Sequence, residues 1–376
     1  MMQIPFNKPH FTGKEQQYLV QAAMQGQLSG NGPYTRRAQA LFCNRYGVTR
    51  SLLTTSCTDA LEMAALLFEI GPGDEVIMPS YTFVSSANAF VLRGARVVFV
   101  DSMPEHPNMD IGTLERLITP QTKAILVMHY GGVANDMEAI LAIAEAHGLK
   151  VVEDAAHSIE ATYKGKPLGS IGQLGALSFH ETKNIITGEG GMLLVNDERL
   201  CERAEIIWEK GTNRAAFQRK EVQKYEWVDV GSSFLPSDLT GACLCAQMEE
   251  VDPIQARRIR HWERYASGLR PLQERENLLL PQLPAFASLN GHLFYMVAKS
   301  REERDRLLHH LHSRGIQAVF HYQALHHSPY YRRTYGTSSL PHAERFSQAL
   351  IRLPLFYALT EQEIDYVIQA IFDFYR

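Results

Sequence analysis

The residue best placed for covalent chemistry is Lys183. It follows a short apolar run at 175–179 that predicts a β-strand, and Gly190 and Gly191 allow a tight return into a second strand at 192–195. A lysine at the edge of a sheet, shielded from water and held near cationic groups, has a lowered pKa. Its neutral amine is then a nucleophile that forms a Schiff base with a carbonyl compound. A surface lysine in a hairpin is the alternative that this segment alone leaves open.

An acid stands at the end of another predicted strand. Asp154 directly follows the strand predicted at 149–153, and small residues come after it. A carboxylate in that place keeps a pyridinium nitrogen protonated, which lets a pyridoxal ring act as an electron sink. His157, slightly further along the chain, is placed to hydrogen-bond the hydroxyl of such a ring. A turn-capping aspartate and a structural histidine are the alternatives that these residues leave open.

Small hydroxyl-bearing residues separate a strand predicted at 51–55 from a helix predicted at 59–68. The start of a helix offers free backbone amides and the positive end of its dipole, which together favour a phosphate group. Cys57 and Thr58 lie at this start, and Ser178 offers a further hydroxyl. The pattern predicts a phosphate site, although it also fits a plain helix cap.

An aromatic pair, Tyr81 and Phe83, follows the strand predicted at 75–78. One aromatic ring in that position can stack on a flat cofactor, and core packing is the alternative. A phosphate site, a stacking ring, an acid and a lysine thus come in that order along the chain, each after a predicted strand. Each signal is weak alone, but chance rarely produces the combination.

Between residues 50 and 195, short apolar strands alternate with helices. This alternation predicts an α/β fold with a largely parallel sheet and helices on both of its faces. The strands of such a sheet end at one edge, where active sites of this architecture lie. Residues 135–138, Asn-Asp-Met-Glu, resemble a capping box and predict a helix that continues to about His147.

The pattern changes after about residue 235. A long helical tract gives way to a strand at 293–298, and capping boxes at 300–303 and 360–363 open two further helices. This order predicts a smaller α+β unit after the large one. The domains that we expect are a large domain with an N-terminal arm over residues 1–240 and a small C-terminal domain over residues 241–376.

Composition excludes several classes of protein. The chain has 376 residues, of which 45% are hydrophobic and 21% charged, as in ordinary globular proteins. Its net charge of −4 offers no general attraction for nucleic acid.

No stretch approaches the about 18 apolar residues of a membrane span, and the first residues lack the apolar stretch of a signal peptide. The five cysteines form no Cys-x-x-Cys pair, which favours a reducing compartment. We expect a soluble, cytoplasmic protein with no membrane or nucleic-acid partner.

Histidines gather at positions 309, 310, 312, 326 and 327. No acid or cysteine accompanies them at the spacing of metal ligands, so we expect no metal site.

Six segments carry a likeness to a known family. They are Ile4–Pro9, Gly30–Pro33, Gly71–Val76, Pro79–Phe83, Glu153–His157 and Ser178–Gly191. Through them, and over nearly its whole length, the chain resembles the DegT/DnrJ family of sugar aminotransferases, which use pyridoxal 5'-phosphate (PLP). The resemblance implies the fold-type I architecture of PLP-dependent transferases, with the large sheet domain and small α+β domain described above.

The resemblance also implies roles for individual residues. Lys183 is implied to bind PLP as a Schiff base and later to carry the proton. Asp154 is implied to pair with the pyridinium nitrogen, and His157, often Gln in relatives, to meet the ring hydroxyl. The other cofactor-binding residues that the resemblance implies are Phe83, which stacks on the ring, and Cys57, Thr58 and Ser178, which hold the phosphate.

The sequence departs from the family pattern in two places. Glu181 stands where many relatives have proline, and residues 231–235 read Gly-Ser-Ser-Phe-Leu where many have Gly-Tyr-Asn-Tyr-Arg. The asparagine of that motif reaches the phosphate in the partner subunit, so Ser233 or Asn213 is expected to take its place. Because relatives build the site from two subunits, we expect a homodimer or higher homo-oligomer with a shared active site.

Segments 209–214, 230–236 and 321–326 are similar to those of family members that act on dTDP-linked 4-keto-6-deoxyhexoses. The resemblance implies transfer of an amino group from L-glutamate to the 4-keto carbon, giving dTDP-4-amino-4,6-dideoxygalactose and 2-oxoglutarate. The residues expected to bind the nucleotide sugar are Gly30, Gly32, His321 and Tyr322.

Other functions remain as alternatives. One is an aminotransferase for a 3-keto nucleotide sugar, and another is a PLP-dependent sugar dehydratase or lyase on the same scaffold. Some relatives replace the lysine with histidine, so the presence of Lys183 favours amino transfer. A nicotinamide oxidoreductase is disfavoured because residues 51–58 contain no glycine and thus no Gly-x-Gly-x-x-Gly.

Overall fold

A seven-stranded sheet forms the centre of the large domain. The computed structural model describes residues 2–376, and its main sheet has the strand order β1-β9-β8-β5-β4-β2-β3. The strands are β1 (Arg50–Thr54), β2 (Glu75–Pro79), β3 (Arg96–Val100), β4 (Thr122–Met128), β5 (Lys150–Asp154), β8 (Leu174–Ser178) and β9 (Gly191–Val195). β9 runs antiparallel to both of its neighbours, and the remaining neighbours pair in parallel. The predicted, largely parallel sheet is confirmed.

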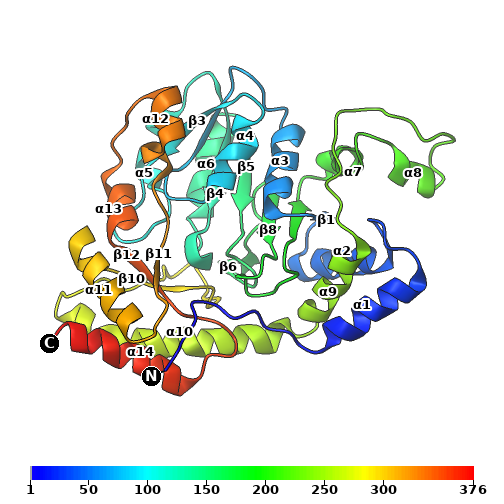
Figure 1. Ribbon diagram of the computed structural model, residues 1–376. Coiled ribbons are helices and arrows are strands. Elements are labelled where there is room, and N and C mark those ends of the chain that lie inside the picture. The colour runs from blue at the N-terminus through cyan, green and yellow to red at the C-terminus, as the bar shows by residue number, and fades with distance from the viewer. Residues whose placement is uncertain (1) are drawn as a thin grey trace.

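Helices cover both faces of this sheet (Figure 1). They include α1 (Lys14–Gln25), α2 (Pro33–Tyr46), α3 (Cys57–Leu67), α4 (Val84–Val91), α6 (Met137–Ala146), α7 (Cys201–Trp208) and α9 (Asp238–Met248). Successive strand residues point to opposite faces, so Leu52 packs in the cluster with α3 whereas Leu53 packs with α2 and α9. In β5, Val152 joins the first of these clusters and Val151 lies in the one formed with α6. Because both faces are buried, the strands are apolar almost throughout.

The side chains of the last two residues of β5 point to opposite faces of the sheet. Asp154 ends the strand at the carboxyl edge, while Glu153 points to the other face and is fully buried. The Glu153 carboxylate accepts hydrogen bonds from the amides of Gly169, Ile171 and Gly172 at 2.7–2.8 Å. His129 Nε2 lies 3.0 Å from its Oε2. This carboxylate therefore fixes the loop that leads into β8.

Glu153→Ala is expected to lower the free energy of unfolding by about 4 kcal/mol, because three buried amides lose their acceptor. Glu153→Gln retains one acceptor oxygen and should lose less. Chemical denaturation followed by circular dichroism measures both variants, with Glu145→Ala on the exposed face of α6 as the control. A loss for Glu153→Ala no larger than that of the control would contradict this account.

The small domain is built on a three-stranded antiparallel sheet of order β10-β12-β11. Its elements are β10 (Phe294–Val297), β11 (Val319–Phe320), β12 (Leu350–Leu353), α10 (Val251–Glu274), α11 (Arg301–Ser313) and α14 (Glu361–Phe374). α10 runs along the lower edge of the molecule with α14 beside it (Figure 1). The predicted boundary between residues 240 and 241 falls inside α9, which packs on α1 and α2.

The N-terminal arm lies against the small domain. Ile4 is buried in the core that α10, α11 and α14 form, and its amide donates to the carbonyl of Gly315 at 2.9 Å. Asn7 then reaches the large domain, where its Nδ2 donates to the carbonyl of Glu181 at 3.1 Å. The arm thus joins the two domains.

Two of the three predicted capping boxes mark the helix starts correctly. The Thr360 box is complete, and Ser300 accepts from the amide of Glu303 at the start of α11. The third prediction is wrong, because the N-cap of α6 is Asp136. Asn135 is buried instead and donates to the carbonyl of Met128 at 2.9 Å, so its side chain serves the preceding loop.

Shorter elements complete the chain. They are α5 (Ile111–Leu114), η1 (Glu115–Leu117), η2 (Tyr130–Gly132), β6 (Thr162–Tyr163), β7 (Lys166–Pro167), η3 (Glu198–Leu200), α8 (Arg214–Gln218), η4 (Leu325–His327), α12 (Pro329–Tyr335) and α13 (Pro341–Ala349). The projecting segment, which runs between the paired residues Glu209 and Ser233 and contains α8, extends from the body at the upper right of the view (Figure 1). Within residues 2–376, no helix has the length and apolar character needed to cross a membrane.

Candidate active site

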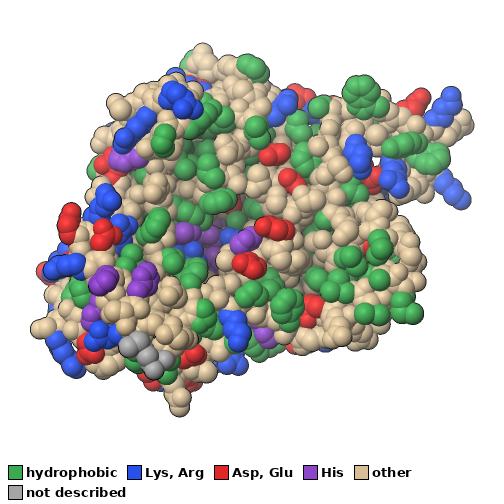
Figure 2. Space-filling view, viewed as in Figure 1, with side chains coloured by type: hydrophobic (Ala, Val, Ile, Leu, Met, Phe, Trp, Pro, Cys, Tyr) green, Lys and Arg blue, Asp and Glu red, His purple; other side chains and the backbone are tan. Residues whose placement is uncertain are grey.

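The carboxyl ends of β4, β5 and β8 border a cavity of about 600 Å³ that the small domain closes from the other side. Figure 2, which has the same view as Figure 1, shows a hollow near the centre of the molecule, with histidine and basic side chains gathered inside it. A cavity of this size is typical of small-molecule sites. The predicted site residues that line it are Cys57, Thr58, Phe83, Asp154, His157, Ser178, Lys183, His321 and Tyr322.

Lys183 lies in the tight connection between β8 and β9. Its amide donates to the carbonyl of His180 at 2.9 Å, and the amide of Glu181 donates to the carbonyl of Gly188, also at 2.9 Å. The side chain is half-buried at the cavity wall, and its withdrawal from water lowers its pKa to about 8. The positive charge of Arg352 lowers the pKa further, whereas the Asp154 carboxylate raises it. A substantial fraction of the amine is therefore neutral near pH 8.

The Asp154 carboxylate is buried and held in one orientation. Ser86 Oγ donates to its Oδ2 at 2.6 Å, and the amide of Ala156 donates to its Oδ1 at 3.2 Å. Thr82 and Ser86 share a hydrogen bond of 2.8 Å, which extends this support into α4. A fixed, buried carboxylate at the cavity wall suits a positively charged ring nitrogen.

His157 is a neutral imidazole. Burial lowers its pKa well below the usual range, and the positive charges of Lys183 and Arg352 lower it further. Its Nδ1 accepts from the amide of Gly131 at 3.2 Å, so the single ring proton must sit on Nε2. That nitrogen lies 3.3 Å from the Tyr322 hydroxyl. His157 therefore presents one donor toward the cavity, as a ring hydroxyl partner requires.

The start of α3 provides the expected anion site. Ser56 caps the helix by accepting from the amide of Asp59 at 3.1 Å, which leaves the first-turn amides of Cys57 and Thr58 at the cavity wall. The positive end of the helix dipole adds to their attraction for a phosphate. Burial raises the pKa of the Cys57 thiol well above its usual range, so this side chain stays uncharged beside the phosphate position.

Gly191 allows the helix start to approach the sheet this closely. A Cβ on Gly191 would lie 2.3 Å from the carbonyl carbon of Ser56 and 2.4 Å from the nitrogen of Cys57. Both atoms belong to the backbone, so the first turn of α3 would have to move. The strand pairing of Gly191 with Thr54 and Ser178 holds it in place on its other sides.

Gly191→Ala is expected to weaken the binding of PLP, the cofactor that the sequence predicts, by about 10-fold or more as the phosphate-binding amides shift. Equilibrium dialysis of the apoprotein against PLP measures the change. Gly71→Ala is the matched control, because a Cβ there meets nothing within 4 Å. Equal affinity in the two variants would rule out this role for Gly191.

Phe83 and Tyr322 form an aromatic wall. The Phe83 side chain is exposed, and its ring centroid lies 6.1 Å from that of Tyr322. Tyr322 lies nearly parallel to His157, and His157 stacks on His292 with centroids 4.3 Å apart. His321 Nδ1 lies 3.0 Å from the hydroxyl of Tyr130, and burial lowers the pKa of His321 well below the usual range.

Four predicted residues do not line the cavity of this single chain. Gly30 and Gly32 instead lie against residues 235–238, and a Cβ on Gly32 would lie 2.3 Å from Cγ of Asp238. Asn213 precedes α8 and accepts from the amide of Glu226 at 2.7 Å, and Ser233 pairs with Glu209 in the same projecting segment. Their roles in binding stay predictions.

Sequence reasoning missed Arg352 and His292, which also line the cavity. Arg352 lies between Ile351 and Leu353 in β12, and a basic residue within an apolar strand was the available signal. His292 lies in the loop before β10, where its Nδ1 is 2.7 Å from Oδ1 of Asn184, and no local pattern marks it. The other lining residues that had no assigned role are Ser56, Leu61, Ser85, Met128, Ala156, His180, Thr182, Glu189 and Gly190.

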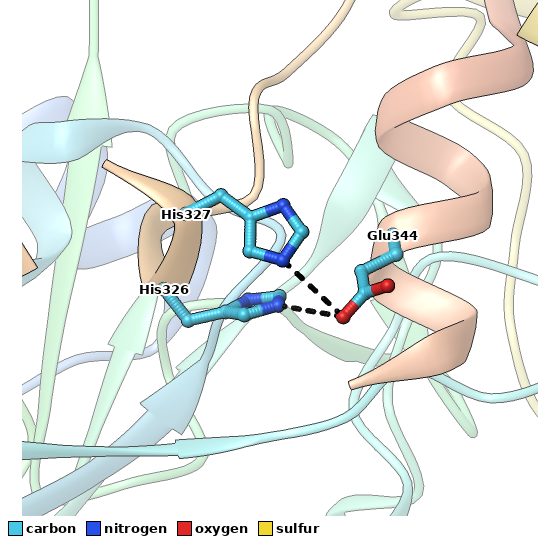
Figure 3. Close-up of side chains that lie close together, drawn as sticks. All are labelled: His326, His327 and Glu344. Carbon is cyan, nitrogen blue, oxygen red and sulfur yellow. Dashed lines mark hydrogen bonds and ion pairs between the residues drawn. The ribbon is translucent and has the colours of Figure 1, made fainter. Parts of the chain in front are cut away.

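A second cluster of titratable side chains lies outside this cavity. His326 and His327 each direct Nε2 toward Oε1 of Glu344, at 3.1 Å and 3.3 Å (Figure 3). Glu344 lies on α13, well after the two histidines in the sequence, so no local spacing pairs it with them. His326 Nδ1 also meets Ser80 Oγ at 2.7 Å, so the protein itself engages both ring nitrogens of His326. The expectation of no metal site stays a prediction.

Comparisons with known proteins extend over nearly the whole chain. The model of the DegT/DnrJ/EryC1/StrS aminotransferase family matches residues 10–372. The chain is 34% identical to the spore coat polysaccharide biosynthesis protein SpsC of Bacillus subtilis strain 168 over 379 residues, covering 98% of this chain and 96% of SpsC. The family model's match includes every residue that lines the cavity.

Solved structures are similar over the same extent. The aminotransferase TlmJ from Streptoalloteichus hindustanus has a TM-score of 0.92 at 30% identity, covering 100% of this chain and 99% of TlmJ. Spr1654 from Streptococcus pneumoniae, solved in its PLP-form, has a TM-score of 0.92 at 26% identity, covering 99% of this chain and 98% of Spr1654.

Proposed function

This chain belongs to the DegT/DnrJ/EryC1/StrS aminotransferase family, and from that premise we propose that it moves an amino group from L-glutamate to the 4-keto carbon of a dTDP-linked 4-keto-6-deoxyhexose. The products are dTDP-4-amino-4,6-dideoxygalactose and 2-oxoglutarate. The chain is a PLP-dependent sugar aminotransferase of fold-type I. The proposal concerns the sugar nucleotide, the carbon that is aminated and the donor.

The observation that supports the site roles proposed for individual residues is the arrangement of Lys183, Asp154 and the start of α3 around one cavity. It fits PLP at three separate points: an amine with a pKa near 8, a buried carboxylate and free helix-start amides. When bound, PLP supplies an electron sink for the carbanion that forms beside the transferred nitrogen. From these three points of fit we propose the roles of the individual residues toward PLP.

The protein's own groups then handle binding and proton transfer. The neutral amine of Lys183 takes a proton from the carbon beside the transferred nitrogen and returns it to the adjacent position. Asp154, fixed by Ser86, keeps the ring nitrogen charged. His157 donates from Nε2 to the ring hydroxyl, and Phe83 offers its exposed face to the ring.

The substrate assignment rests on particular segments. Residues 209–214, 230–236 and 321–326 resemble those of the dTDP-4-amino-4,6-dideoxygalactose transaminase of enterobacterial common antigen synthesis. SpsC, a relative, is a spore coat polysaccharide biosynthesis protein. Of the nucleotide-sugar residues proposed from these segments, His321 and Tyr322 lie at the cavity. We therefore assign the enzyme to cell-envelope polysaccharide synthesis.

The test is incubation of the PLP-loaded protein with L-glutamate and a panel of dTDP- and UDP-linked 3-keto and 4-keto sugars, with product identification by NMR. Amination at carbon 4 of the dTDP-linked 6-deoxyhexose, with an axial amine, is the expected result. Amination at carbon 3 would identify a 3-keto aminotransferase. Loss of a sugar hydroxyl without consumption of L-glutamate would identify a dehydratase, and either outcome overturns the proposal.

We further propose that two copies of the chain share the active site. The projecting segment carries exposed apolar side chains, among them Trp227 at 83% and Tyr225 at 52% exposure, which are typical of a surface covered by a partner. Asn213 and Ser233 lie in this same segment. Light scattering after size-exclusion chromatography should give twice the chain mass of 42.5 kDa or a higher multiple. A stable, fully active species of single-chain mass would contradict the shared site.

A further inference from the structure

His292 connects the small domain to two segments of the active site. It lies in the loop before β10, is buried and lines the cavity. Its imidazole stacks on that of His157, with ring centroids 4.3 Å apart and an angle of 25° between the planes. Its Nδ1 lies 2.7 Å from Oδ1 of Asn184, the residue that directly follows Lys183. One side chain of the small domain therefore contacts both His157 and the turn that carries Lys183.

The hydrogen bonds of Asn184 fix the position of the proton on His292. Asn184 Nδ2 donates to the backbone carbonyl of Asn290 at 3.0 Å and to Oε1 of Gln255 at 2.7 Å. Asn184 Oδ1 is therefore the acceptor in its contact with His292, and His292 Nδ1 is the donor. Burial lowers the pKa of His292 well below the usual range, and nearby positive charges, Lys183 among them, lower it further. The neutral ring thus has a single donor, and Asn184 uses it.

Buried polar groups also hold the loop that carries His292. Arg258 donates to the carbonyl of His292 at 2.7 Å and to that of Gly291 at 3.1 Å. The amide of His292 donates to Oδ1 of Asn290 at 3.1 Å, and Nδ2 of Asn290 donates to the carbonyl of His157 at 2.7 Å. A buried network whose members all have partners is rigid. The His292 ring is therefore a fixed surface against which a neighbouring side chain can rest.

His157 requires such a surface. Its ring contacts the amide of Gly131 at 3.2 Å and the hydroxyl of Tyr322 at 3.3 Å, and both distances exceed the about 3.0 Å that is usual for a hydrogen bond. Long contacts at the two ring nitrogens place little restraint on tilting of the ring plane, whereas a stacked neighbour restrains it directly. A tilt of about 10–20° is enough to spoil a designed contact in an active site. The stack with His292 therefore matters for the direction in which His157 Nε2 donates.

We propose that His292 is a positioning residue. Anchored through Asn184 to the turn that carries Lys183, it holds the imidazole of His157 in the orientation in which Nε2 donates to the hydroxyl of the PLP ring. The inference rests on the role proposed for His157 and goes beyond it, because it makes the geometry at the cofactor depend on the packing of the small domain. His292 acts through His157 and needs no contact of its own with the cofactor.

The absorbance of bound PLP tests this role without turnover. A hydrogen bond to the ring oxygen favours the form in which that oxygen carries its full negative charge, so it lowers the pKa that the absorbance reports in a pH titration. His292→Leu fills the volume without a flat face and is expected to raise this pKa by about 1, a 10-fold change in proton affinity. His292→Phe restores a flat ring and should bring the pKa at least halfway back. His309→Leu, at an exposed position of α11, is the control and should change nothing.

The two histidine variants form a matched pair, because neither can donate to Asn184 and they differ in the flat ring. An equal rise in both variants, or no rise in either, would therefore overturn the proposal. If neither variant binds PLP, Asn184→Ala takes their place. It keeps the His292 ring but removes its acceptor, and it too should raise the pKa, whereas an unchanged value would overturn the proposal.

A double variant decides whether the effect passes through His157. His157→Ala should raise the same pKa at least as much as His292→Leu does, and the two changes together should raise it no further than His157→Ala alone. Additive rises would show that His292 affects the cofactor by another route and would overturn the proposal.

The failures of the separate proposals can be told apart. An unchanged pKa in His157→Ala would refute the role proposed for His157, and the inference about His292 with it. A rise in His157→Ala with none in His292→Leu would refute the inference alone. These titrations contain no sugar, so a protein that aminates no keto sugar would overturn the proposed substrate and leave the positioning role of His292 to stand on its own result.

Discussion

Amino transfer by Lys183→Ala is expected to fall by about 10⁴-fold or more, because the variant loses both the covalent attachment point and the proton carrier. The cofactor can still bind through the start of α3 and Asp154, so the loss should appear in the rate rather than in occupancy. Borohydride reduction followed by mass spectrometry should add a pyridoxyl group to the wild type and not to the variant. Lys166→Ala, at an exposed position in β7, is the control and should keep full activity.

The lowered pKa of Lys183 adds a pH dependence to this prediction. Covalent attachment of PLP requires the neutral amine, so its rate in the apoprotein should rise with pH through about 8 and level off above it. An ordinary exposed lysine would give a rise centred near 10.5. A midpoint near that value would show that the amine is not withdrawn from water.

Asp154→Ala should have the second-largest effect, a fall in kcat of about 10³-fold, because the ring nitrogen loses the charge that keeps it protonated. Asp154→Asn keeps the shape but not the charge and should lose nearly as much. Asp365→Asn breaks a surface contact with Arg264 and is the matched control.

A chemical rescue distinguishes this electrostatic role from a structural one. A PLP analogue methylated on the ring nitrogen carries its positive charge permanently, so it should restore part of the activity of Asp154→Ala. The same analogue should not help Lys183→Ala, whose defect is a different one. Failure of the analogue to bind would point to a steric role for Asp154, and normal activity of the variant with PLP would refute the assignment.

The sheet and the residues at its edge could be predicted because the information is local. The strands predicted at 75–78 and 149–153 differ from β2 and β5 by no more than one residue at either end. Residues that directly follow parallel strands meet at one edge whatever else the chain does. The cavity therefore brings Asp154, Ser178 and Lys183 together as expected.

The small domain's contribution could not be predicted in the same way. Arg352 and His292 reach the cavity only because two domains pack together, and no spacing in the sequence records that packing. The packing of Gly30 and Gly32 could not be predicted for the same reason. These glycines lie tightly against Leu235 and Asp238, which are about two hundred positions away in the sequence. Glu344 meets His326 through a long-range contact of the same kind.

The first residues of the chain connect the small domain to the turn that carries Lys183. Ile4 is anchored in the small domain, Phe6 lies under Arg352, and Asn7 is tied to the turn that carries Lys183. Cleavage of the chain just after Asn7 would therefore remove both the ring beneath Arg352 and the tether to the turn that carries Lys183. Loss of this short peptide should lower the rate of amino transfer even where both domains stay folded.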